Sequence, residues 1–484
     1  MRKLLLPLAV SLAAIASPSW AQWQSIEGAR FVVISEDSER NLRAASRELE
    51  RFDLVLRQYF GRPTGETAVR RLPVYLVTPR ELADLYPGQT HVAGFYAASA
   101  ENIFGAAERR ESLATIKHEY AHHFLAGEWK GALPAWFSEG FAQYFSTAEF
   151  DGDRVHIGKP PAWSGNALLG SGWMPLDRLL TERPIQQDGN IARTYYPLSW
   201  LLTHWFLKDE ESKAKLERYL AAVTAGTPSV TAMEQATGMS LEELRRTLSV
   251  YAGSNLGFRT ATLAQDNANP PLETLPGEAD ELLLPVLRLA MSMPESERPA
   301  HLARIHALAS RYGDTPYALY ARAYAEYRLA RDFGQAEPLL QQLLAQDPEH
   351  ADAQLLLGRI YLARADRAAQ TGQEADLRTR AQTHLAAAYR IDPENPFTLT
   401  SLGRNRRLAP SYPNENDMDV LRLAYEIAPQ HPYTGINLAE ALIKLNQLDV
   451  AKGILVPLVN NPHRANPQAQ ALLDRINSQQ TRQD

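Results

Sequence analysis

Two histidines, His118 and His122, lie four residues apart in a stretch whose apolar residues recur at helical spacing. Residues four apart project from the same face of a helix, so both imidazoles can reach a single cation. Glu119 follows the first histidine and completes the H-E-x-x-H pattern that is typical of zinc sites. Zinc in a hydrolytic site takes three protein ligands and keeps one open position, so a third donor must come from elsewhere in the chain.

Glu139 is the natural third ligand, because it lies on a second predicted helix a short way downstream. This helix is expected to open at Pro134, a residue suited to the first helical turn. Residues 128–133 are enough for a turn that brings the second helix back against the first. Gly140, beside Glu139, is expected to let the two helix backbones approach closely. The second helix also carries many aromatic residues: Trp136, Phe137, Phe141, Tyr144 and Phe145.

The predicted chemistry is metal-assisted hydrolysis. A Zn2+ ion held by His118, His122 and Glu139 would lower the pKa of a bound water from about 15.7 to near 7. Glu119 would take the proton of that water and return it to the leaving amine. On its own the H-E-x-x-H pattern is equally compatible with two solvated histidines beside a surface carboxylate. The second helix, with its W-x-x-E-G-x-A-x-Y pattern, favours the zinc site.

Together these segments resemble the gluzincin metallopeptidases, and in particular the peptidase MA-like domains related to thermolysin and the zinc aminopeptidases. The resemblance is strong over residues 116–145 and looser over residues 23–251. It implies an α+β, thermolysin-like domain that cleaves a peptide or protein substrate. It also implies that Glu119 is the catalytic base and that Glu139 is the third zinc ligand.

Members of this family tend to have a tyrosine that stabilises the tetrahedral intermediate at the start of a later helix. Tyr196 matches that position best, and Tyr195 is the neighbouring alternative. A tyrosine packed in an aromatic-rich helix is the competing structural role. Glu101 and Asn102 are similar to the end of the Gly-x-Met-Glu-Asn segment of the zinc aminopeptidases. The glycine and methionine of that segment are absent here, so the resemblance does not imply aminopeptidase activity.

The N-terminal residues 1–21 have the pattern of a secretory signal peptide, with a basic start, a short apolar stretch and small residues before Gln22. We therefore expect a periplasmic or secreted protein. The chain contains no cysteine, which is compatible with an oxidising compartment. Its net charge of −6 gives no reason to expect nucleic-acid binding. No later segment is long and apolar enough to predict an integral membrane helix after signal cleavage.

Residues 22–254 are expected to form the peptidase domain. A hairpin over residues 94–104 is the candidate edge strand to which an extended substrate would add. Residues 151–172 are expected to be a loop, and residues 255–277 a linker. The other expected elements are strands at 29–34 and 72–77, a helix at 38–60, a short helix at 80–86, and helices at 173–180, 195–208, 212–224 and 241–251.

Residues 278–480 are Ala-rich helical sequence interrupted by prolines. These prolines recur at intervals somewhat longer than the roughly 34-residue tetratricopeptide period. The segment resembles a degenerate tetratricopeptide array beginning near Tyr317, after a helical pair over residues 278–312. Such an array stacks into a superhelix with a concave surface that can dock a protein or peptide partner. The alternative is a spacer that merely stabilises the peptidase domain.

These observations predict an exported zinc metallopeptidase with an α+β gluzincin domain followed by an all-α tetratricopeptide-like array. One alternative is a periplasmic scaffold or adaptor that retains the peptidase fold with little turnover. The intact set of His118, Glu119, His122 and Glu139 argues against it, because a scaffold needs no base beside a zinc water. A second alternative is a zinc amidase that acts on cell-wall amides.

Overall fold

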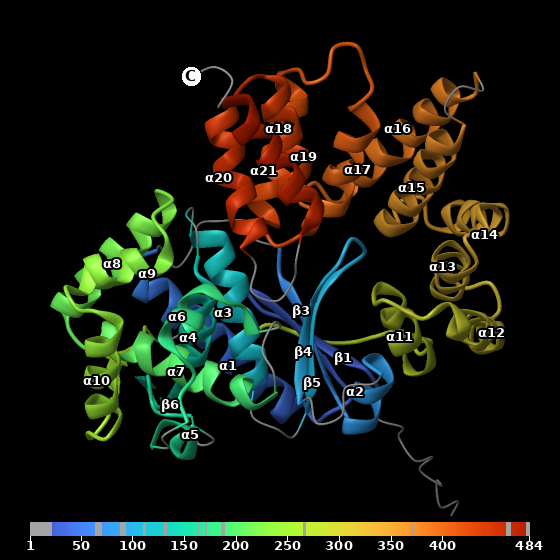
Figure 1. Cartoon of the computed structure of the whole chain (residues 1–484). Helices are drawn as coiled ribbons and strands as arrows, with labels where there is room; N and C mark the ends of the chain where they lie inside the picture. Colours follow the sequence, from blue (N-terminus) through green and yellow to red (C-terminus); the bar gives the residue numbers. More distant parts are fainter. Residues whose placement is uncertain are drawn as a thin grey trace, which may run out of the picture.

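The computed structural model of the chain describes residues 22–62, 70–87, 93–109, 113–129, 131, 133–161, 164–169, 172–184, 189–264, 268–368, 372–460 and 466–480. The expected signal peptide, residues 1–21, lies outside the described residues. Figure 1 shows an N-terminal part that contains a sheet and helices, and a C-terminal arch of helices above and beside it. The expected order of a mixed part followed by an all-helical part is confirmed.

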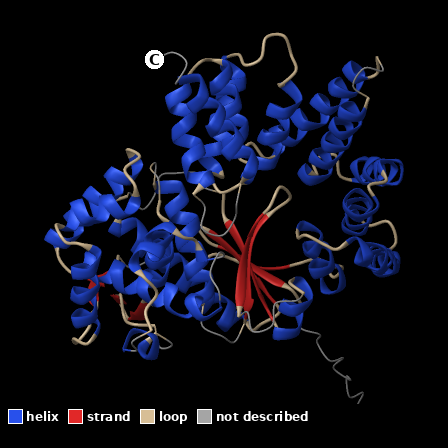
Figure 2. Cartoon of the chain, in the orientation of Figure 1, coloured by secondary structure: helices blue, strands red, loops and turns tan. Residues whose placement is uncertain are grey.

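A six-stranded sheet lies at the centre of the N-terminal part (Figure 2), in the order β4-β5-β3-β2-β1-β9. The strands β2, β3 and β5 run parallel, whereas β4, β1 and β9 pair antiparallel with their neighbours. The two strands and the hairpin expected from the sequence are confirmed, and β4 is an outermost strand of this sheet. The strand bounds are β1 Gln24–Glu27, β2 Phe31–Ser35, β3 Leu72–Val77, β4 Gly94–Ala98, β5 Ile103–Glu108 and β9 Leu272–Thr274.

Helix α1, Glu39–Tyr59, packs against β2 and against the helix that carries the two histidines. It begins where expected because the Ser38 side chain accepts a hydrogen bond from the backbone N–H of Asn41. Its buried face, which includes Phe52, shares one hydrophobic core with Phe31 of the sheet. Helix α2, Pro79–Leu85, begins with a reciprocal capping box between Thr78 and Glu81.

The second half of the N-terminal part is mostly helical, as expected, and the structure adds two helices that the sequence did not predict, α5 within the expected loop and α9. Both are short, with five residues in α5 and nine in α9, so their periodic signals are short. Helix α7 begins at Gly189, earlier than expected, and keeps Pro197 in its interior. The helix bounds are α3 Ala114–Glu128, α4 Ala135–Ser146, α5 Gly165–Leu169, α6 Leu176–Thr181, α7 Gly189–Leu207, α8 Glu210–Thr224, α9 Ser229–Thr237 and α10 Leu241–Ala252.

Two segments expected to be irregular contain strands. Residues 151–172 contain most of the hairpin of β6, Glu149–Asp151, and β7, Arg154–Ile157. In the expected linker, residues 255–277, β8 (Arg259–Thr262) pairs with β7 while β9 pairs with β1. The sequence reading failed here because these strands are short, and their pairing partners lie far away in the chain. Residues of this segment therefore belong to both the six-stranded sheet and a second, three-stranded sheet in the order β6-β7-β8.

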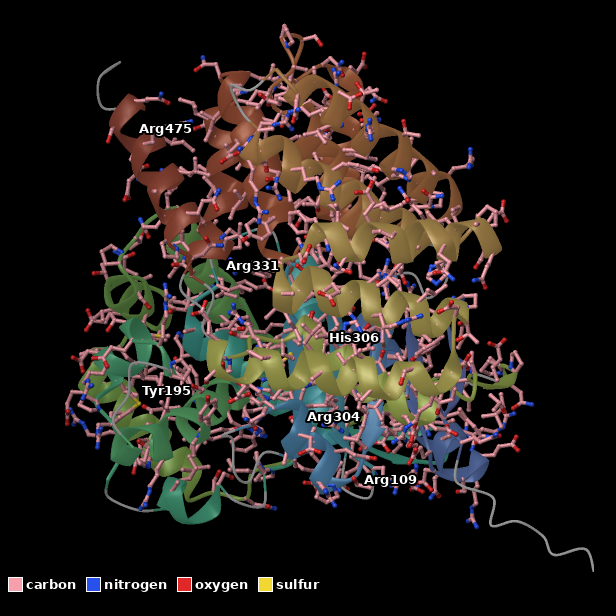
Figure 3. The ribbon with its side chains drawn as sticks, turned by 90° about the vertical axis from the view of Figure 1, so that its right-hand side faces the viewer. Arg109, Tyr195, Arg304, His306, Arg331 and Arg475 are labelled. Atoms are coloured by element: carbon pink, nitrogen blue, oxygen red, sulfur yellow. The ribbon has the colours of Figure 1, made fainter. Side chains whose placement is uncertain are left out.

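The C-terminal part is a succession of helices that pack as consecutive pairs, α13 with α14, α15 with α16, α17 with α18 and α19 with α20. Figure 3 shows its first helices stacked side by side, with Arg304 and His306 on α12. Their bounds are α11 Ala279–Leu287, α12 Arg298–Ala309, α13 Pro316–Ala325, α14 Phe333–Gln346, α15 Ala351–Arg367, α16 Glu374–Ile391, α17 Pro396–Arg406, α18 Glu415–Ile427, α19 Pro432–Lys444, α20 Leu448–Val459 and α21 Pro467–Gln480.

Small residues mark the points of closest approach within these pairs. A Cβ atom on Gly358 of α15 would lie 2.7 Å from the Leu385 side chain of α16. A Cβ atom on Gly403 of α17 would lie 2.6 Å from the Leu421 side chain of α18. A larger residue at either position would separate the pair. None of the described helices is long and apolar enough to cross a membrane.

Candidate metal centre

Helices α3 and α4 pack against each other and bring the three predicted metal ligands together. The Nε2 atoms of His118 and His122 lie 3.2 Å apart on α3. Glu139 on α4 places Oε2 3.4 Å from Nε2 of His118 and 3.6 Å from Nε2 of His122. All three ligand atoms lie within 4.8 Å of one another. They form the one group of three such residues among the described side chains that could hold a metal ion.

The spacing of these atoms fits a tetrahedral metal ion. When ligands lie about 2.0 to 2.2 Å from a zinc ion, the edges of the tetrahedron measure about 3.3 to 3.6 Å. The three observed separations, 3.2, 3.4 and 3.6 Å, fall close to that range. The side chains thus stand at coordination spacing without any rearrangement.

Ser138 orients one of the two imidazoles. Its Oγ lies 3.0 Å from Nδ1 of His122, so a proton on Nδ1 can be donated to the hydroxyl. The Nε2 lone pair of His122 then faces the other ligands, which is the arrangement that a metal-binding histidine needs. The sequence reading did not select Ser138. The only sequence signal was its position directly before Glu139, on the same turn of α4.

Burial adds an electrostatic reason for a cation at this point. The Glu139 side chain is fully buried, and the side chains of His118 and His122 are only 13% and 12% exposed. A carboxylate transferred out of water needs compensation by positive charge or hydrogen bonds. A divalent cation between the three side chains would supply that compensation.

Gly140 packs closely against a different helix from the one that the sequence predicted. A Cβ atom at Gly140 would lie 2.2 Å from the carbonyl oxygen of Ser199 and 2.2 Å from Oγ1 of Thr203, both on α7. Glycine therefore allows α4 to approach α7, whereas the prediction named the helix of the histidines. The error has a simple cause, because a glycine indicates close packing without identifying the partner.

The two candidate tyrosines of α7 have different surroundings. The Tyr195 side chain is fully buried and its hydroxyl donates a hydrogen bond to the Glu182 carbonyl oxygen at 3.2 Å. Tyr196 is only partly buried. Burial raises the pKa of Tyr196, and the charges of Glu139 and Glu119 raise it further. Tyr196 is thus near both carboxylates of the candidate centre, while its role remains a prediction.

A buried polar network fixes α3 against α1. The Tyr120 hydroxyl donates a 2.6 Å hydrogen bond to Oδ1 of Asp53, and Arg57 donates a 2.7 Å bond to Oδ2 of the same carboxylate. Lys117 reaches Oε1 of Glu48 at 2.9 Å. These charge-assisted bonds hold the histidine helix in one position on α1.

The edge strand β4 touches the histidine helix through Tyr96. Its hydroxyl lies 3.0 Å from Nδ1 of His123, the residue after the second predicted ligand. Burial lowers the pKa of His123 to about 4, so its ring is neutral at pH 7. The sequence reading treated His123 as an ordinary histidine and did not select Tyr96. Their pairing depends on tertiary packing between β4 and α3.

Glu101 is paired with arginines of the helical array. It lies in the turn between β4 and β5, where Arg359 and Arg328 of the helical array bind its two carboxylate oxygens.

Comparison with known proteins identifies one repeat. A tetratricopeptide repeat family model matches residues 327–370. A thermophilic tetratricopeptide protein from Thermus thermophilus is 21% identical; the match covers 42% of this chain and 98% of that chain, with a TM-score of 0.34. Yeast Tom70 is 8% identical; the match covers 75% of this chain and 70% of that chain, with a TM-score of 0.29. No curated protein matches significantly.

The family match supports the tetratricopeptide assignment of the C-terminal part, and repeats of this kind indicate docking of a protein. None of these comparisons supports the metallopeptidase resemblance of the N-terminal part. The peptidase assignment therefore depends on the residues of the candidate centre.

Proposed function

We propose that the chain is an exported zinc-dependent metallopeptidase of the gluzincin type. The observation that carries the proposal is the convergence of His118, His122 and Glu139 within 4.8 Å, with Glu119 on the same helix as the histidines. Export is proposed from the sequence pattern of residues 1–21, and the peptidase domain from residues 22–254 together with the strands β8 and β9.

The three ligands would hold the metal ion, and Ser138 would keep the His122 ring in the orientation for binding. A bound zinc ion supplies a Lewis acid that polarises a carbonyl group and acidifies water. Glu119 follows His118 on α3 and is not one of the three converging ligands. Its carboxylate would accept the proton of the attacking water and later return it to the leaving nitrogen.

Tyr196 would donate its hydroxyl proton in a hydrogen bond to the oxygen anion that forms from the substrate carbonyl. Burial and the carboxylates of Glu139 and Glu119 raise the pKa of Tyr196, so the hydroxyl keeps its proton at neutral pH. A protonated tyrosine is the form that can stabilise such an anion.

The proposed substrate is an extended peptide. The strand β4 lies at one edge of the sheet and packs against α3, next to the ligands. An extended peptide can add to such an edge through backbone hydrogen bonds, which favours peptide bonds over other amides.

The test is the zinc content of the purified protein, measured together with cleavage of a broad peptide library. We expect one zinc ion per chain and cleavage that a chelator abolishes. Glu139→Ala should lose zinc, and Glu149→Ala is the matched control because Glu149 is an exposed glutamate on β6. A folded wild-type protein without zinc would refute the proposal.

A protein-docking scaffold is the second candidate, and the tetratricopeptide match at residues 327–370 favours it. Zinc binding without cleavage of any peptide would support this candidate over the peptidase. The two functions are compatible in one chain if the array delivers a substrate or a partner to the candidate centre.

A further inference from the structure

The turn between β4 and β5 is bound by the helical array of the same chain. Arg359 of α15 places Nη1 2.8 Å from Oε2 of Glu101 and donates from Nη2 to the Ala100 carbonyl oxygen at 2.8 Å. Arg328 places Nη1 3.4 Å from Oε1 of Glu101. One planar guanidinium thus binds both the side chain and the backbone of the turn, and a second binds the remaining carboxylate oxygen.

Each of the two arginines also contacts another part of the array. Arg328 lies in a π-helical segment, Glu326–Ala330, and its Nε donates to the Leu289 carbonyl oxygen at 2.9 Å. The Arg359 guanidinium lies 5.9 Å from the centre of the Phe397 ring on α17. Glu101 is only 12% exposed, so its ion pairs are shielded from water and from salt.

A second part of the array touches the same hairpin. The turn between α18 and α19 brings Gln430 close to Tyr96 of β4. His431, the next residue, is buried and lies close to the backbone of Ala100. The Tyr96 hydroxyl also lies 3.0 Å from Nδ1 of His123, so the hairpin lies between this part of the array and the histidine helix α3.

The space left between the turn and the array is small. A cavity of about 190 Å³ remains there, whereas sites for small ligands usually measure about 300 to 1,000 Å³. Its lining comes from both parts of the chain and includes Glu101, Asn102, Tyr320, Tyr324, Arg359 and Phe397. The hairpin turn already occupies this face of the array.

We propose that Arg359 and Arg328 form a clamp for Glu101, and that this clamp positions the edge strand β4 beside the candidate metal centre. The ligand of this array face is then the chain's own hairpin, and Glu101, Arg328 and Arg359 are positioning residues. The contacts of Arg328 and Arg359 with Glu101 and Ala100 support the clamp by themselves. Its effect on substrate binding rests on the proposed peptidase function, because β4 is the strand to which the substrate would add.

The test is a double-mutant cycle read by hydrogen exchange of the amides in β4 and β5. Glu101→Gln and Arg359→Gln should each speed exchange in this hairpin about tenfold, because each breaks a shielded ion pair that holds the turn. The double variant should speed exchange by less than the product of the two single effects, because both changes remove the same Glu101–Arg359 ion pair. Arg404→Gln is the matched control, since Arg404 pairs with Asp366 inside the array.

Peptide cleavage and zinc content are measured on the same variants. The single variants should keep their zinc and raise KM severalfold with little change in kcat, and Arg359→Lys should restore part of the KM. Unchanged exchange in both single variants, or equal acceleration in Arg404→Gln, would overturn the clamp. A wild-type protein without zinc or cleavage would refute the proposed function, while the exchange data would still decide the clamp.

Discussion

Replacing Gly140 with alanine should both destabilise the protein and weaken its metal site. The new Cβ atom would lie 2.2 Å from the Ser199 carbonyl oxygen and 2.7 Å from the Ser199 carbonyl carbon. Ordinary contacts of this kind measure roughly 3.4 Å, so the backbones of α4 and α7 must separate by about 1 Å. Overpacking of this kind costs about 1 to 3 kcal/mol, and the rigid backbone contact places Gly140→Ala at the upper end of that range.

The same separation moves the residue next to Gly140, which is the proposed ligand Glu139. A displacement of about 1 Å is large compared with the tolerance of about 0.2 Å on metal–ligand distances. We therefore expect zinc affinity to fall by about tenfold to a hundredfold, as it does when the support of a ligand is lost. Denaturant unfolding and competition with a chromogenic chelator measure the two effects separately.

Gly127→Ala is the matched control for this experiment. Gly127 lies near the end of α3, the histidine helix, and a Cβ atom there would meet nothing within 4 Å. Alanine in such a helical position should be neutral or stabilise the protein by about 0.5 to 1 kcal/mol. If Gly140→Ala is as stable as Gly127→Ala and binds zinc equally well, the close approach of α4 and α7 is refuted.

Three further predictions concern single side chains. Glu119→Gln should lower kcat by about 10² to 10⁴ with zinc content intact, whereas Glu128→Gln, at the end of the same helix, should have wild-type kcat; an active Glu119→Gln enzyme would exclude the base role. Tyr196→Phe should lower kcat by about 10² or more, and Tyr195→Phe should instead cost about 1 kcal/mol of stability; the reverse outcome would exchange the two roles. Burial lowers the pKa of His431 to about 3, so the folded state binds a proton at this ring less readily than the unfolded state does. The neutral ring therefore contributes its full share to the unfolding free energy above about pH 6.5, and this contribution is lost as the pH falls toward 3. His431→Asn should therefore flatten the pH dependence of the unfolding free energy in this window, and equal slopes would refute the assignment.

Several elements could be predicted from the sequence because they depend on near neighbours in the chain. The four-residue spacing of His118 and His122 places both imidazoles on one face of α3 wherever that helix lies. Ser38 caps α1 through a bond to a residue three positions away. The periodic prolines and small residues of the array likewise indicate helix ends and close contacts within a repeat. Such features need no knowledge of distant segments.

Other features were decided by tertiary structure alone, because they join segments that are far apart in the sequence. Gly140 indicated a close approach, but only the packing of α4 identified α7 as the partner. The segment 255–277 has the composition of a linker, yet it forms strands where β7 and β1 supply hydrogen-bonding partners. Glu101 meets Arg359 across 258 residues, and only the fold of the array brings their charges together. The sequence alone determined which side chains could bind metal; the fold determined that Glu139 joins the two histidines, because only helix packing brings α4 against α3.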